Sequence, residues 1–199
     1  MRAGAFLLTA AVLLTGYNIW DEQRAASGTE ELLTHFMTEI PEPDRPDAIP
    51  DYLLNPDMEM PTVEIDGNRY IGLIEIPSLD LILPVISTCD QGKLKIAPCR
   101  YSGTAYKSGF VIAGHNYRAH FLRIRNLTAG DVVEFIDIDG NRFEYTVAKS
   151  EILDPYAVEE MTAPDWDLTL FTCTYGGGER YTVRCEKGNA GVVTDGENK

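Results

Sequence analysis

Beyond residue 62, this chain of 199 residues contains seven short segments in which apolar residues recur with a period of two. The period is typical of β-strands, because successive side chains of a strand point to opposite faces of the sheet. Many short strands without long helices between them indicate a β-barrel or a β-sandwich. The expected strands are residues 70–76, 79–86, 109–113, 132–138, 142–148, 168–173 and 180–185. We therefore predict an all-β domain over residues 62–187, with room for one small helix near residues 158–161.

The composition narrows the class of protein. With 44% hydrophobic residues the chain can bury one good core, which excludes disorder as the overall state. Its 17 Lys and Arg against 31 Asp and Glu give a formal net charge of −14, so we expect no nucleic-acid partner. The four cysteines lack the paired C-x-x-C spacing of a structural zinc site and are too few for a disulfide-built scaffold. We therefore expect a fold held by apolar burial, with no metal ion and no cofactor.

The N-terminal apolar segment limits the location of the protein. Residues 3–20 carry no charge, Arg2 precedes them, and Asp21 and Glu22 follow. As a helix this segment is about 27 Å long, close to the roughly 30 Å hydrocarbon core of a bilayer. The positive residue before it places the rest of the chain outside the cell. We predict that residues 1–20 form a single-pass signal anchor in the cell membrane; the alternative is a cleaved signal peptide.

Residues 21–61 are expected to connect this anchor to the β domain. Ser27 or Thr29 can cap a short stalk helix. Its apolar residues recur at three and four positions: Leu32, Leu33, Phe36, Met37 and Ile40. Six of the 11 prolines then fall between residues 41 and 61, which excludes both a helix and a central strand. We predict a stalk helix followed by a Pro-rich linker or wrapping arm, and a flexible C-terminal tail over residues 188–199.

A short sequence, Ile-Asp-Gly-Asn-Arg followed by an aromatic residue, occurs twice, at residues 65–70 and 138–143. Asp-Gly and Gly-Asn supply the positive φ angles of a tight hairpin, and the aromatic residue resumes the strand. We interpret the similarity as two hairpin turns and not as a domain repeat.

The three histidines differ in their surroundings. His115 follows the apolar run at residues 110–114, where a buried strand is expected to emerge and Gly114 lets the backbone pass close to a neighbour. This placement makes His115 the candidate to face a functional site. His35 belongs to the expected stalk helix and is predicted to lie at the surface. His120 follows in a loop, where a solvated or merely hydrogen-bonded role is expected.

Cys173 ends an apolar strand directly before the glycine loop at residues 176–178. A cysteine in a partly exposed, electropositive pocket can become a reactive thiolate. Cys173 and Arg180 are equidistant from the centre of this loop, so we expect them to face each other across neighbouring strands. The planar guanidinium of Arg180 is suited to hold an oxyanion or a substrate carbonyl. Arg184 is roughly 13 Å farther along the strand, and we expect it in an ion pair at the surface or barrel rim.

Taken in order, these segments resemble the sortases, the cysteine transpeptidases of Gram-positive bacterial surfaces. The resemblance rests on AGHN at residues 113–116, LTLFTC at residues 168–173 and the arginine that opens the next strand. Upstream, IGLIEIP at residues 71–77, LILPVI at residues 81–86 and YSGTA at residues 101–105 also look like sortase sequence. The likeness covers about residues 62–187, and an N-terminal anchor fits the usual topology of the family.

The resemblance implies an eight-stranded β-barrel with Cys173 as nucleophile, His115 as general acid and base, and Arg180 as the oxyanion or substrate-positioning group. It implies attack on a backbone carbonyl within an LPxTG-like sorting signal of a surface protein, which gives a thioacyl-enzyme. An amine of a cell-wall precursor or a pilin lysine then resolves this intermediate.

Two departures from the family pattern leave the subclass unassigned. Only six residues separate Cys173 from Arg180, and the segment at residues 148–168 is also short, so we expect an unusual substrate pocket. A cysteine hydrolase, in which water resolves the thioacyl-enzyme, is one competing function. A catalytically silent cell-surface binding barrel is another, although it would need none of the three site residues.

Two further segments have alternative interpretations. Residues 55–61 either wrap the surface or lie across the active-site groove as an internal lid. We expect structural thiols at Cys89, Cys99 and Cys185, with Cys89 and Cys99 as the pair if one disulfide forms.

Overall fold

The computed structural model describes residues 2–39 and 49–188, with the side chains of residues 7–38 in the first range. The expected C-terminal tail therefore lies outside the described residues, apart from Gly188. Nine strands belong to one sheet within the described residues. They are β1 (Val63–Ile65), β2 (Asn68–Ile76), β3 (Leu81–Ile86), β4 (Cys99–Ser102), β5 (Phe110–Ala113), β6 (Val132–Asp137), β7 (Arg142–Leu153), β8 (Leu168–Cys173) and β9 (Arg180–Lys187). The helices are α1 (Arg2–Glu39), α2 (Asp51–Leu54) and α3 (Val158–Met161), with 3-10 turns η1 (Pro77–Leu79), η2 (Lys93–Lys95) and η3 (Phe121–Asn126).

The sheet closes into a barrel of eight strands. Its strand order is β2-β3-β4-β5-β8-β9-β7-β6, and β6 pairs again with β2. β1 is added outside this ring as a hairpin on β2. Fully buried side chains such as Ile74, Phe110, Phe135, Leu170 and Val183 fill the core. Closure leaves no open edge within the ring, which protects the short strands from pairing with other chains.

The β domain agrees with the periodicity of the sequence. All seven expected strands are confirmed, and α3 lies at the residues expected for the small helix. The third strand starts at Leu81 because η1 turns the chain at Pro77. The sequence did not indicate β1, which has three residues, or β4, whose four residues include a half-buried arginine and an exposed tyrosine. These two strands depend on pairing with neighbours more than on an apolar pattern of their own.

Both expected hairpin turns are confirmed. Asp66 and Gly67 have φ angles of 49° and 75° between β1 and β2, and Gly140 has a φ angle of 81° between β6 and β7. Such left-handed conformations favour Asp, Asn and Gly. The repeated sequence therefore encodes two hairpin turns and not a domain repeat.

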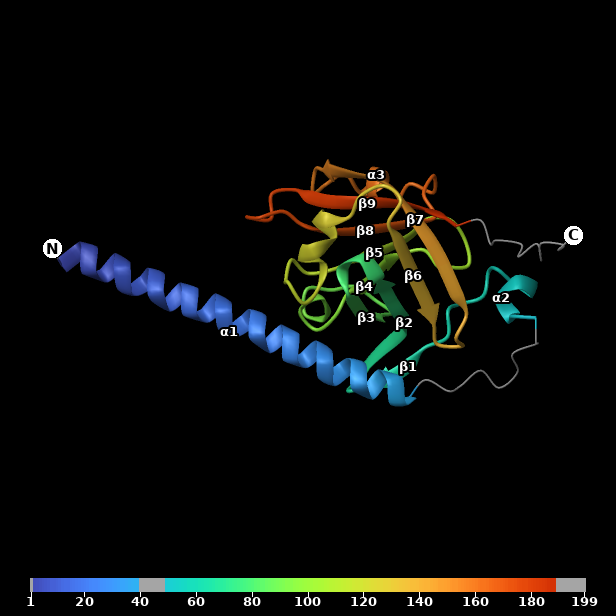
Figure 1. Ribbon diagram of the computed structural model, residues 1–199, viewed down its shortest axis with the longest axis horizontal. Helices are drawn as coiled ribbons and strands as arrows, with labels where there is room; N and C mark the ends of the chain where they lie inside the picture. The colour runs from blue at the N-terminus through green and yellow to red at the C-terminus, as the bar shows by residue number, and fades with distance from the viewer. Residues whose placement is uncertain (1, 40–48, 189–199) are drawn as a thin grey trace, which may run out of the picture.

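The N-terminal region is one continuous helix, α1, where an apolar segment and a separate stalk helix were expected (Figure 1). Thr29 does not cap a new helix, because its hydroxyl donates to the carbonyl oxygen of Ala25 at 2.8 Å within the same helix. The second half of α1 packs on the barrel, and its buried residues recur on one face: Ala25, Thr29, Leu32 and Phe36. Tertiary packing of this face supports the helix through the point where we had expected a break.

The expected membrane-spanning helix is not confirmed. Among the residues whose side chains are described, no helix contains a stretch that is long and apolar enough to cross a membrane. Residues 3–6 of the apolar segment lie outside those described side chains.

Of the expected Pro-rich arm, the structure describes residues 49–62. This part lies against the barrel: Met60 is buried in the core, and Met58 and Tyr52 pack against it. The Tyr52 ring also stacks on Tyr106, with centroids 4.8 Å apart. These contacts hold the arm on the β domain.

Candidate active site

Three neighbouring strand ends bring the predicted site residues together. β5 and β8 are parallel and in register, with Ala113 opposite Phe171. The Gly114 amide continues this pairing and donates to the Phe171 carbonyl oxygen at 3.0 Å. His115 follows Gly114, and Cys173 ends β8 two residues after Phe171. Because paired strands advance in step, His115 and Cys173 emerge next to each other at the same end of the barrel.

The predicted pairing of Cys173 with Arg180 across β8 and β9 is observed. The loop between them turns at Gly176 and Gly177, whose φ angles of 85° and 75° are left-handed. Thr174 closes the loop by accepting from the Gly177 amide and donating its own amide to the Glu179 carbonyl oxygen, both at 2.9 Å. The six-residue connection therefore places an arginine directly beside the candidate nucleophile.

A cavity of about 500 Å³ opens beside these strand ends. Cys173 and Arg180 line it, and Cys173 is half-buried. Apolar side chains from several elements form much of its wall: Leu94, Ala113, Val158, Met161 and Phe171. An apolar cavity with a few polar groups at one end is the usual form of a small-ligand or peptide-binding site. The half-buried Cys173 is thus accessible from this cavity.

His115 follows Gly114, which lines this cavity, but is not itself a lining residue and is half-buried. Burial lowers the pKa of His115 below its usual value, an effect that Asp21 opposes and Lys95 reinforces. Its Nδ1 atom is buried and has no hydrogen-bond partner among the described residues. At neutral pH the imidazole is therefore uncharged and able to accept a proton.

Gly114 is required where the chain leaves β5. A Cβ atom at this position would lie 2.3 Å from the Phe121 ring of η3. The close approach anticipated at this glycine is therefore with Phe121. It allows η3 to pack beneath the loop that carries His115.

Arg180 lines the cavity, and its guanidinium also contacts its own loop. Nη1 donates to the carbonyl oxygens of Gly177 at 3.1 Å and Glu179 at 3.2 Å. These bonds place the planar group at the entrance beside Cys173, with donors left over for a ligand.

Arg125 is a neighbour of Cys173 that the sequence analysis missed. From η3, its Nη2 donates to the Cys173 carbonyl oxygen at 2.9 Å and to Asn116 Oδ1 at 3.3 Å. Its guanidinium also lies over the Tyr175 ring, 4.7 Å from the centroid. Arg125 therefore links the His115 loop to the end of β8. No local pattern signals this role, although an arginine within ten residues of His115 was a visible hint.

Arg184 forms the expected ion pair with a carboxylate, but it is buried and not at the surface or rim. It is 2% exposed, and its Nε donates to Glu151 at 2.7 Å. Its other donors bond Thr169 Oγ1 and the carbonyl oxygens of Glu160 and Met161. Only the expected location was wrong, because α3 covers this side of β9. Arg184 is a buried structural arginine.

His35 and His120 do not line the cavity either. His35 is on α1 with its side chain 54% exposed, as expected. His120 is fully buried, and its Nε2 lies 3.2 Å from Thr29 Oγ1 of α1. Of the two roles considered for His120, the hydrogen-bonded one is confirmed and the solvated one is wrong.

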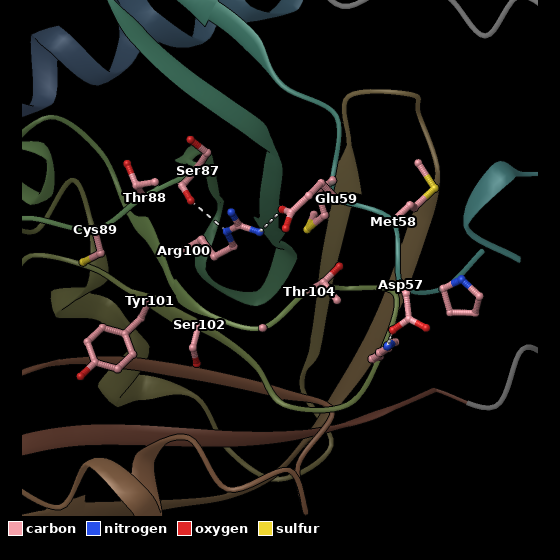
Figure 2. A pocket seen from close by; sticks show the side chains of 14 residues that line it. Asp57, Met58, Glu59, Ser87, Thr88, Cys89, Arg100, Tyr101, Ser102 and Thr104 are labelled. Atoms are coloured by element: carbon pink, nitrogen blue, oxygen red, sulfur yellow. Dashed lines mark hydrogen bonds and ion pairs between the residues drawn. The ribbon is translucent and has the colours of Figure 1, made fainter.

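A second cavity, of about 480 Å³, lies between the arm and the loops that flank β4 (Figure 2). Arg100 is central to it: its Nε donates to the Ser87 carbonyl oxygen at 2.8 Å, and its Nη1 lies 3.7 Å from Glu59 Oε2. Residues 56–60 line this cavity and do not line the one that contains Cys173. The structure therefore favours a wrapping arm over a lid across Cys173.

All four cysteines are thiols. Cys99 and Cys185 are buried, and Cys89 is half-buried at the boundary between the two cavities. A hydrogen bond between the Cys89 and Cys99 thiols lowers the pKa of Cys89 and raises that of Cys99. The pair singled out from the sequence is thus in contact. In the described part of the chain, no group of three His, Cys, Asp or Glu side chains is placed to hold a metal ion.

Comparison with known families gives the context of this geometry. Residues 74–188 match the model of the sortase domain. The chain belongs to the sortase family. Members of this family are cysteine transpeptidases. The matched residues include the strand ends that carry His115, Cys173 and Arg180.

The chain is also similar to individual sortases. It is 32% identical over 138 residues to sortase A of Bacillus anthracis; the alignment covers 64% of this chain and 65% of that relative. The fold is similar to the Clostridium perfringens sortase D5 transpeptidase, with a TM-score of 0.57, 20% identity and coverage of 82% and 97% of the two chains. Sortase A from Corynebacterium diphtheriae gives a TM-score of 0.56, 21% identity and 86% coverage of each chain.

Proposed function

We propose that this chain is a sortase-type cysteine transpeptidase in which Cys173 is the nucleophile, His115 the general acid and base, and Arg180 the oxyanion group. The observation that supports the proposal is the register of β5 with β8 and of β8 with β9: Cys173 and Arg180 line one cavity together with Gly114, the residue before His115. A cysteine, a base and a cationic donor are the groups required for acyl transfer.

The first half of the reaction forms a thioacyl-enzyme. Cys173 Sγ attacks a backbone carbonyl carbon of the substrate while the thiol proton passes to the neutral His115. Negative charge develops on the carbonyl oxygen, where Arg180 can donate. The C–N bond then breaks, and His115 returns its proton to the leaving amine. The product is a thioester on Cys173.

The second half transfers the acyl group. An amine nitrogen attacks the thioester carbon and gives its proton to His115, and Cys173 leaves and is protonated again. The proposed acyl donor is a surface protein with an LPxTG-like sorting signal, and the proposed acceptor is an amine of a cell-wall precursor or a pilin lysine. The apolar wall of the cavity supports the binding of aliphatic peptide side chains.

Mass spectrometry with LPxTG-like peptides, with and without an added amine, tests the proposed reaction. We expect a covalent adduct on Cys173 and a ligated product that depends on the amine. Rapid release of free acid in the presence of excess amine would support a hydrolase instead. Absence of any adduct across peptides would support a silent binding barrel.

The membrane anchor is a second part of the proposal. The large apolar side chains between residues 7 and 20 are 54–70% exposed, and this half of α1 projects away from the barrel (Figure 1). Such all-round apolar exposure is unfavourable in water and is satisfied by lipid. We propose a single-pass protein with its catalytic domain outside the cell.

N-terminal sequencing of the native protein tests the anchor. We expect the mature chain to retain residues 1–20, and a start beyond Trp20 would identify a cleaved signal peptide. Deletion of residues 1–20 should give a water-soluble enzyme that remains active, because this deletion leaves the half of α1 that packs on the barrel.

A further inference from the structure

The second half of α1 contacts the loop that carries His115. Tyr117, two residues after His115, donates its hydroxyl to Asp21 Oδ2 at 2.6 Å. One residue further, the Arg118 amide donates to Glu22 Oε1 at 3.2 Å. Two turns along the helix, Thr29 lies against His120. A helix distant in sequence from the barrel thus holds the His115 loop at three positions.

Tyr117 also lies directly against His115. The two rings are stacked, with centroids 3.8 Å apart and an interplanar angle of 20°. The Tyr117 ring also contacts His120, whose ring packs edge-on at 5.5 Å. The phenol is therefore held by two ring contacts and by the bond from its hydroxyl. Stacking leaves the His115 ring little freedom to rotate.

The hydroxyl of Tyr117 remains a donor throughout the physiological range. Burial and the hydrogen bond to Asp21 raise the pKa of Tyr117 to about 12. The contact is thus a charge-assisted bond from a neutral phenol to a carboxylate, which is stronger than a neutral one.

We propose that Tyr117 is a positioning residue for His115, and that Asp21 of α1 holds Tyr117 in place. Docking of α1 then sets the orientation of the imidazole beside Cys173. The inference rests on the proposed role of His115 as acid and base. It assigns a role in the reaction to a helix that lies outside the barrel.

The charges that face His115 come from several elements. Asp21 is on α1, Lys95 is on η2, and His120 lies in the same loop. Asp21 favours the protonated imidazole, whereas Lys95 disfavours it. The pKa of His120 is about 4 because it is buried, so His120 is neutral where His115 titrates.

Titration of His115 by NMR tests the electrostatic part in the full chain, carried in detergent micelles with a Cys173→Ala background. We expect Asp21→Asn to lower the pKa of His115, because a carboxylate that stabilises the imidazolium is removed. Glu22→Gln is the matched control, since it removes the adjacent carboxylate, which bonds a backbone amide, and should leave the pKa unchanged. Equal pKa values in the unaltered protein and Asp21→Asn would overturn the proposal.

Kinetics of the same full chain with Cys173 intact test the positioning part. Tyr117→Phe keeps the stacked ring and loses the bond to Asp21, so we expect kcat to fall about 3- to 10-fold with KM unchanged. Tyr117→Leu removes the stack as well, and we expect a loss of about 10²-fold in kcat. Full kcat in Tyr117→Leu would overturn the proposal.

The NMR titration and the kinetics distinguish failure of the positioning proposal from failure of the proposed transpeptidase function. If the unaltered chain forms no acyl-enzyme, the transpeptidase proposal fails, yet the NMR titration still reports whether Asp21 controls His115. If the chain ligates peptides and Asp21→Asn leaves both the His115 pKa and the acid limb of kcat/KM unchanged, only the positioning proposal fails.

Discussion

The two ends of the β8–β9 pair have the same pairing pattern and opposite environments. At one end Cys173 pairs with Arg180 beside a glycine loop, and both residues are half-buried at a cavity. At the other end Thr169 pairs with Arg184, and both are almost fully buried and hydrogen-bonded to each other. The same residue type therefore serves different purposes four positions apart on one strand. An arginine with free donors can act on a ligand, whereas one whose donors are occupied holds the fold together.

The largest expected difference between the two ends concerns their cysteines. Cys173→Ala should abolish acyl-enzyme formation and leave the free energy of unfolding nearly unchanged, because a half-buried sulfur contributes little packing. Cys185→Ala, at the fully buried end, should lower the free energy of unfolding by about 1 kcal/mol and leave ligation intact. Mass spectrometry and urea unfolding measure the two effects. Peptide ligation by Cys173→Ala would show that Cys173 is not the nucleophile and that the two ends do not differ in this way.

The two arginines give the next largest contrast. Arg180→Lys keeps the charge but loses the planar fork, so kcat/KM should fall by about 10²- to 10³-fold if Arg180 contacts the oxyanion. Arg184→Lys removes several buried hydrogen bonds, and we expect the free energy of unfolding to fall by about 2–4 kcal/mol with kcat/KM retained below the unfolding transition. A greater loss of kcat/KM in Arg184→Lys than in Arg180→Lys would reverse the two assignments.

A third prediction concerns Arg125, which contacts the end of the β8–β9 pair that carries Cys173 and Arg180. Arg125→Lys retains a cation but loses the simultaneous bonds to Cys173 and Asn116, so we expect kcat/KM to fall about tenfold. Arg123→Lys, on the same 3-10 turn, is the matched control and should leave kcat/KM unchanged. Equal activity of the two variants would show that the bridge from η3 to β8 is not needed.

The smallest expected effects are the pH dependences of activity and of stability. Activity should depend on His115 near the open end of the β8–β9 pair, and stability on Glu151 at the buried end. The acid limb of kcat/KM should lie below the usual histidine range, because burial lowers the pKa of His115 and its neutral form is the base. At the buried end, Glu151 is partly desolvated, yet hydrogen bonds from Lys149 and Arg184 lower its pKa. A lowered carboxyl pKa gives stability that is complete above the unfolded value of 4.5 and is lost as pH falls through the folded value.

The stability gap between the unaltered chain and Arg184→Lys should therefore narrow only below about pH 4.5. Activity should already have fallen at that pH. Chemical unfolding and kcat/KM, measured across one pH series, show at which pH the stability gap narrows and at which pH activity is lost. A stability gap that closes between pH 6 and 7 would show that a histidine, and not Glu151, is linked to Arg184.

Much of the β domain follows from local sequence. Alternating apolar residues identified seven strands, and the two Asp-Gly turns fixed two hairpins, because both signals are encoded within a few adjacent residues. The pairing of Cys173 with Arg180 could be predicted from the sequence for the same reason, since the glycine loop sets the register of the two strands. β4 could not be predicted from its own residues, because its four residues include a half-buried arginine and an exposed tyrosine and show no apolar alternation.

The sequence by itself determined the strands, the hairpin turns and the candidate residues His115, Cys173 and Arg180, because each is marked by a pattern within about ten residues. The tertiary structure alone decided three other features: the burial of Arg184 under α3, the bridge of Arg125 to the Cys173 carbonyl oxygen, and the contact of Asp21 with Tyr117. These contacts join residues 24, 48 and 96 positions apart. These contacts arise because closure of the barrel and docking of α1 bring together side chains that no short sequence pattern connects.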